Sequence, residues 1–81
     1  MRQIVLKGVV HVKNENLVLL RSKAGFSQSK IAELLGVHQT TVSTWENGYR
    51  QPSKENRLKL AKLYGVSVEY LFYASYYDTV S

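Results

Sequence analysis

Residues 27–52 read SQSKIAELLGVHQTTVSTWENGYRQP and contain two short helical patterns separated by a turn at Gly36 and Val37. Apolar residues recur at helical spacing in both patterns, at the inward positions Ile31, Ala32, Leu35, Val42 and Trp45. The second pattern spans about His38 to Asn47, and its outward face carries Gln, Thr and Ser but almost no charge. An exposed helix face ordinarily collects Glu and Lys, so this face predicts a surface that reads a ligand.

Three further helices are predicted around this stretch, at about residues 14–24, 53–64 and 68–72. Asn14 or Asn16 can cap the first of them, and Gly25 can end it. At the start of the chain, residues 2–13 (RQIVLKGVVHVK) alternate in polarity, are rich in β-branched residues and favour a strand. The sequence therefore predicts an all-α fold of five helices with an N-terminal β-strand extension. Its parts are a strand or arm at residues 1–13, a helical domain at residues 14–73 and a tail at residues 74–81.

The composition indicates one small domain with a polyanionic partner. The 81 residues carry a net charge of +5, to which residues 1–62 contribute +7 and residues 63–81 contribute −2. A basic body of this kind favours nucleic acid, although a solvated surface without a partner gives the same balance.

Several other classes of function find no support in the residues. The chain has no cysteine, which excludes disulfides and thiolate metal sites and suits a reducing cytoplasm. His11 and His38 lie in different elements without metal-ligand spacing, so no metal and no cofactor is predicted. No apolar stretch approaches the ~20 residues that span a membrane. No convincing acid pair and no Gly-rich phosphate loop is present, which argues against an enzyme.

An ordered set of short motifs occupies about two-thirds of the chain, between residues 17 and 72. The pieces are Leu20-Arg21, Gly25-Phe26-Ser27-Gln28, Ile31-Ala32, Leu35-Gly36-Val37, Thr41-Val42-Ser43, Trp45-Glu46-Asn47-Gly48, Pro52 and Leu60-Ala61-Lys62-Leu63-Tyr64-Gly65-Val66-Ser67. In this order and spacing they resemble the lambda-repressor/Cro-type helix-turn-helix family, also called the XRE type. The resemblance implies a five-helix lambda-repressor-like DNA-binding domain with its helix-turn-helix core at residues 27–47.

The resemblance also implies which residues touch double-stranded DNA, because the third helix of this fold enters the major groove. The residues expected at base edges are Gln39, Thr40, Ser43 and Thr44. The residues expected at the DNA backbone are Gln28, His38, Thr41, Asn47, Tyr49, Arg50 and Lys54. A Gln can bond an adenine edge twice, and a Thr methyl can pack on the thymine methyl. The alternative for each is an ordinary solvated side chain.

Glu46 has a different expected role. The resemblance places it against Arg21 as a partly buried ion pair that ties the reading helix to the core, which is a structural function. Trp45 is expected in the core rather than stacked on a base. His38 departs from the family, where Ser or Thr often caps the third helix, and it is a poorer cap. Arg57 occupies a position where the family is commonly apolar, which leaves the inward face of the fourth helix open.

Family members bind palindromic operators as dimers, so a homodimer is expected. Two regions could form its interface. The first is the aromatic C-terminal segment, with Tyr64, Tyr70, Phe72, Tyr73, Tyr76 and Tyr77, since aromatic residues are enriched in interface cores. The second is the N-terminal strand at residues 2–13, which needs an edge partner. Alternatively, the strand and the tail pack against each other within one subunit.

The predicted function is that of a sequence-specific transcriptional regulator, a phage-type or bacterial repressor that occupies a palindromic operator. Its expected location is the cytoplasm, on the nucleoid, as a bacterial or phage-encoded protein. The alternative is an antitoxin-type interaction protein, which binds a partner toxin through the aromatic tail as well as its own promoter. A neighbouring second small reading frame would favour that alternative.

Overall fold

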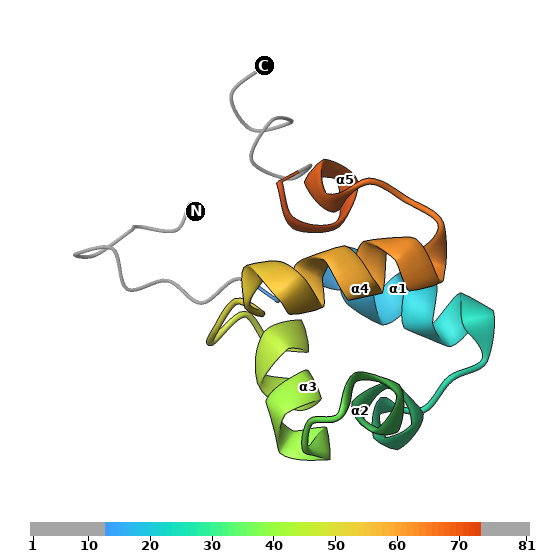
Figure 1. Ribbon diagram of the computed structural model, residues 1–81, viewed down its shortest axis with the longest axis vertical. Helices are drawn as coiled ribbons and strands as arrows, with labels where there is room; N and C mark the ends of the chain where they lie inside the picture. The colour runs from blue at the N-terminus through green and yellow to red at the C-terminus, as the bar shows by residue number, and fades with distance from the viewer. Residues whose placement is uncertain (1–12, 74–81) are drawn as a thin grey trace, which may run out of the picture.

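The computed structural model describes residues 13–73, and within them the chain forms five α-helices and no strand (Figure 1). The helices are α1 (Glu15–Ala24), α2 (Gln28–Leu35), α3 (Gln39–Glu46), α4 (Lys54–Tyr64) and α5 (Val68–Phe72). The all-α prediction is confirmed. The predicted strand at residues 2–13 lies, apart from Lys13, outside the described residues, as does the tail at residues 74–81.

The helices enclose one small core. In Figure 1, α1 and α4 run through the middle of the molecule, with α5 on one side and the pair α2 and α3 on the other. The helix α1 packs against α3, α4 and α5, while α2 packs mainly against α3. All five helices contribute to the buried cluster of Leu17, Ile31, Ala32, Leu35, Val42, Trp45, Leu60, Ala61 and Leu71. Trp45 is therefore a core residue, as expected.

Capping side chains begin four of the five helices. Asn14, Ser27, Ser53 and Ser67 each accept a hydrogen bond from a backbone N–H of the first turn that follows. His38 stands at the same position before α3 and makes no such bond, so α3 lacks a side-chain cap. The prediction from the sequence that His38 is a poor cap is confirmed.

The turn between α2 and α3 depends on Gly36. Its φ is +72°, in the left-handed region, and its backbone N–H bonds to Glu33 O at 3.3 Å. Val37 N–H then bonds to Ala32 O at 2.9 Å, which closes the end of α2. A Cβ at position 36 would meet no atom within 4 Å, so the backbone angle and not space selects glycine here. This short turn fixes α3 against α2.

Asn14 joins the ends of three helices. Its Oδ1 accepts from Leu17 N at 3.0 Å at the start of α1, and its Nδ2 donates to Leu71 O of α5 at 3.0 Å. Its backbone N–H donates to Glu46 O, at the end of α3, at 2.8 Å. The neighbouring Asn16 adds a bond from Nδ2 to Tyr70 O at 2.9 Å. The last turn of α3 is thus held by the segment that enters α1.

The position of Arg57 shows which residues form the inward face of α4. Its Nη1 donates to Pro52 O at 3.2 Å, so the guanidinium closes the start of the helix and does not enter the core. Leu60 and Ala61 are the buried residues of α4. None of the helices between residues 13 and 73 combines the length and apolar character needed to cross a membrane.

Candidate nucleic-acid interface

The helix α3 presents one polar face to solvent and buries the other. His38, Gln39 and Thr40 are exposed at its start, and Ser43 and Thr44 are half-buried one turn later. Val42, Trp45 and Glu46 are buried on the opposite side. The structure therefore brings the four predicted base-reading residues onto one surface of α3, and none of these four side chains is charged. It has the donors and acceptors of amides and hydroxyls, the groups that read base edges in the major groove.

The amide of Gln39 is held at both ends by side chains of α2. Ser29 Oγ donates to Gln39 Oε1 at 3.0 Å. Gln39 Nε2 donates to Gln28 Oε1 across a longer distance of 3.5 Å. These contacts reduce the freedom that an exposed glutamine otherwise has, and less rotamer entropy is lost when it binds a ligand. Ser29 was not among the predicted site residues.

Two further hydrogen bonds stay within α3 and its C-cap residue. Thr44 Oγ1 donates to Thr40 O at 2.8 Å, so its hydroxyl is satisfied and its methyl remains for contact. Asn47 Nδ2 donates to Ser43 Oγ at 3.3 Å. The Thr44 oxygen can still accept a hydrogen bond, and its methyl is suited to apolar contact, such as with the thymine methyl.

A partly buried ion pair lies on the inward side of α3. Arg21 Nε bonds Glu46 Oε2 at 2.6 Å and Arg21 Nη2 bonds Glu46 Oε1 at 3.1 Å, while Arg21 Nη1 donates to Phe26 O at 2.9 Å. Gln28 Nε2 also donates to Glu46 Oε1, at 2.9 Å. Glu46 is only 5% exposed. The carboxylate therefore links α1, α2 and α3 at one point.

The pKa values of Arg21 and of the nearby Tyr64 are both raised. The hydrogen bond to Glu46 raises the pKa of Arg21 above its ordinary value, so the guanidinium keeps its charge. Burial raises the pKa of Tyr64 to about 12, and the Glu46 carboxylate adds to this shift because a second negative charge nearby is unfavourable. Tyr64 thus remains neutral beside the pair at physiological pH.

The predicted backbone-contacting residues surround α3 at two places. Gln28 and His38 lie at the starts of α2 and α3, while Asn47, Tyr49, Arg50 and Lys54 follow α3 and are exposed. A surface hollow of about 400 Å³ lies beside α3 and the loop that follows it, lined by Thr40, Thr41, Thr44, Trp45, Arg50 and Gln51. The Thr41 hydroxyl and the Arg50 guanidinium are donors that suit a phosphate oxygen. Gln51 was not predicted, and only its closeness to Arg50 in the sequence could have indicated it.

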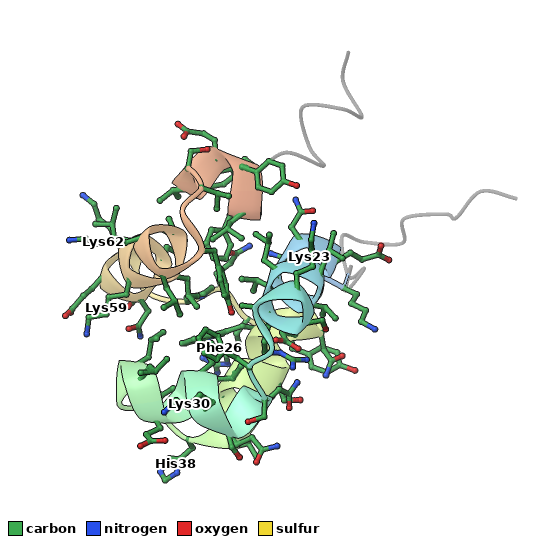
Figure 2. All side chains as sticks on the ribbon, turned by 90° about the vertical axis from the view of Figure 1, so that its right-hand side faces the viewer. Lys23, Phe26, Lys30, His38, Lys59 and Lys62 are labelled. Carbon is green, nitrogen blue, oxygen red and sulfur yellow. The ribbon has the colours of Figure 1, made fainter. Side chains whose placement is uncertain are left out.

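The remaining cations are spread around the molecule. In Figure 2, Lys59 and Lys62 project from α4 and Lys23 projects from α1, whereas His38 lies at the far tip, between α2 and α3. Lys30 is close to Glu33 on its own helix at 3.8 Å. The part of the chain that the structure describes has no group of three His, Cys, Asp or Glu side chains able to hold a metal ion.

The fold and this surface define a helix-turn-helix protein, and comparison with known proteins assigns the family. The Helix-turn-helix family matches residues 17–71, so the chain belongs to the XRE-type helix-turn-helix family. The HTH-type transcriptional regulator ImmR of Bacillus subtilis strain 168 is 43% identical over 51 residues, which are 63% of this chain and 40% of that protein.

Two further relatives are similar over the same region. The HTH-type transcriptional activator BcrR of Enterococcus faecalis is 34% identical over 58 residues, or 72% of this chain and 28% of that protein. The HTH-type transcriptional regulator AnsR of Bacillus subtilis strain 168 is 37% identical over 57 residues, or 70% of this chain and 49% of that protein. The matched region thus spans less than half the length of each of these three relatives.

Proposed function

We propose that this protein is a transcriptional regulator that binds double-stranded DNA in a sequence-specific manner through the major groove. The observation that carries the proposal is the exposed, uncharged first turn of α3, where the amide of Gln39 is held by Ser29 and Gln28. A preorganised neutral amide is suited to a base edge, while a charged face grips phosphates without reading sequence. The family and the names of its relatives support the same function.

Base contact is assigned to Gln39, Thr40, Ser43 and Thr44, and backbone contact to Gln28, His38, Thr41, Asn47, Tyr49, Arg50 and Lys54. The hollow beside α3 supports the second group, because Arg50 and Thr41, which both line it, could hold a phosphate oxygen. This division separates residues that choose the sequence from residues that set affinity and register.

The experiment is a binding selection on random double-stranded DNA, followed by affinity measurements on the selected site. Gln39→Ala is expected to lower specific affinity by ~1–3 kcal/mol and to relax one base position. Arg50→Ala is expected to weaken all sequences alike and to reduce the slope of affinity against salt by about one phosphate contact.

Two controls match these variants, one in side-chain type and one in charge. Gln51→Ala removes an exposed glutamine that lines the hollow but lies outside α3; any loss of affinity should be equal for all sequences, so the preferred bases should be unchanged. Lys62→Ala removes a cation that projects from α4, away from the tip where His38 lies, and should leave the salt slope unchanged (Figure 2). A Gln39→Ala protein with unaltered affinity and base preference would show that the reading face is assigned wrongly.

We further propose that the protein acts in the cytoplasm as a homodimer that represses from a palindromic operator. Two aromatic side chains of the C-terminal segment support an interface there, since Tyr70 is 43% exposed and Tyr73 is 38% exposed. Sedimentation equilibrium and the symmetry of the selected sites test this. A monomer that selects a single half-site would refute the dimer and leave the aromatic segment to another protein partner.

A further inference from the structure

A line of hydrogen bonds runs from the buried ion pair to the surface of α3. Arg21 donates to Glu46, Gln28 Nε2 donates to Glu46 Oε1 at 2.9 Å, and Gln39 Nε2 faces Gln28 Oε1 at 3.5 Å. Ser29 Oγ completes the line by donating to Gln39 Oε1 at 3.0 Å. The first members are buried or half-buried and the last two are exposed. The line thus connects the core to the proposed base-reading amide.

The direction of each bond follows from the chemistry of the first acceptor. An ionised carboxylate has lone pairs and no hydrogen, so it can only accept. The group that Gln28 turns toward Glu46 must therefore be its NH₂, which leaves its Oε1 facing outward. That oxygen is also only an acceptor, so Gln39 must turn its own NH₂ toward Gln28 and its Oε1 toward Ser29. The hydroxyl of Ser29 can donate or accept, so it completes the line without setting its direction.

The opposite orientation of these amides is unfavourable because Glu46 is buried. If the Gln28 amide rotated by half a turn, its oxygen would face the carboxylate and a buried acceptor would lose a donor. Arg21 holds the carboxylate with two bonds, at 2.6 and 3.1 Å, and prevents it from turning away. An exposed glutamine has no such preference by itself, since its two amide orientations have the same shape.

We infer that Glu46 and Gln28 are positioning residues that fix which end of the Gln39 amide presents an acceptor and which presents a donor, while Ser29 helps to hold that amide in place. The inference rests on the proposed function of Gln39 as a base-reading residue. After both bonds are made, Oε1 keeps one lone pair and Nε2 keeps one hydrogen. An amide in this state can accept from adenine N6 and donate to adenine N7, whereas guanine opposes the same oxygen with its O6 acceptor. The buried ion pair thereby selects adenine over guanine.

The main test is the adenine-to-guanine ratio at the base position that Gln39 reads, measured with the full chain. Gln28→Ala breaks the line near its middle and should lower this ratio by about 5- to 10-fold, part of the discrimination of a bidentate pair. Glu46→Gln, which can donate as well as accept, should lower it similarly. Ser29→Ala should lower it less. Glu33→Gln makes the same chemical change at an exposed site of α2 and should leave the ratio unchanged.

Each result must separate recognition from folding and from general DNA affinity. Circular dichroism checks that every variant is folded, and Gln28→Ala keeps the test valid if Glu46→Gln unfolds. Gln28 is also a proposed phosphate contact, and the loss of such a contact lowers affinity for all sequences alike without changing the ratio between two bases. An unchanged ratio in folded Gln28→Ala and Ser29→Ala proteins would overturn the inference.

The free protein offers a second readout that needs no DNA. In a ¹⁵N-labelled sample, the side-chain NH₂ signals of Gln39 should move toward those of a solvated glutamine in Gln28→Ala, and remain in place in Glu33→Gln. Signals that do not move in Gln28→Ala would overturn the hydrogen-bond line whatever the DNA result. If these signals move but the wild type selects no base sequence, the line stands and the proposed function fails, together with the recognition role.

Discussion

Replacement of Glu46 by alanine is expected to lower the free energy of unfolding by about 3 kcal/mol, because it leaves Arg21 without its partner. Glu46 is 5% exposed and accepts bonds from Arg21 at 2.6 and 3.1 Å and from Gln28 at 2.9 Å. Loss of one partner of a buried pair costs ~3–5 kcal/mol. We expect the lower end of this range, because the Arg21 side chain keeps 17% exposure and retains its bond to Phe26 O.

The assay is urea denaturation followed by the fluorescence of Trp45, the single tryptophan, which is 6% exposed and precedes Glu46 in the chain. A domain of this size has a total stability of roughly 4–12 kcal/mol, so the predicted loss is a large fraction of it. The same loss corresponds to a fall in Tm of roughly 12–24 °C.

The matched control is Glu33→Ala. The Glu33 side chain is 72% exposed and lies 3.8 Å from Lys30, so its removal should cost less than about 1 kcal/mol. A double variant, Arg21→Met with Glu46→Leu, tests the cause, since apolar replacement of both partners should recover most of the lost stability. A Glu46→Ala variant that loses less than about 1 kcal/mol would refute the view that this pair is desolvated and interdependent.

Two further predictions concern Tyr64 and His38. Tyr64 has a pKa of about 12 in the folded protein against 10.0 as its ordinary value, so its contribution to stability is complete below pH 10 and is lost as the pH rises from 10 to 12. The loss of stability is at most ~2.7 kcal/mol for two pKa units, and ~1–2 kcal/mol for this half-buried group. Between pH 9 and 11, the urea midpoint of Tyr64→Phe should therefore fall less steeply than that of the wild type. His38→Ser supplies α3 with the cap that it lacks and should raise stability by ~0.5–1 kcal/mol in thermal unfolding, and an unchanged Tm would count against that position as the cap.

The sequence was sufficient to predict the helices and most of their ends. Period-3.6 spacing located Ile31, Leu35 and Val42 in the core, and all three are buried. The start of α2 at Ser27 and its end at Gly36 could be predicted, because capping and left-handed turns depend on a few neighbouring residues.

The contacts between helices were harder to predict. The bond of Asn14 to Leu71 O joins residues 57 positions apart, and no periodicity encodes that distance. Ser29 was not predicted, because its contact with Gln39 exists only once the turn at Gly36 has set α3 against α2. Glu46 was expected from the resemblance to pair with Arg21, but its bond to Gln28 required the packed geometry.

The double variant that restores stability also distinguishes two reasons for a charged pair at this place. If Arg21 and Glu46 served only to join α1 to α3, an apolar pair of similar volume would be an adequate substitute, since buried ion pairs contribute little net stability. A leucine at position 46, however, offers no acceptor to the NH₂ of Gln28, and the Gln28 amide becomes free to turn. The stable Arg21→Met, Glu46→Leu protein should therefore bind DNA with a weakened choice between adenine and guanine. Stability and specificity would then separate in one protein, and a double variant that keeps the wild-type base preference would return Glu46 to a purely structural role.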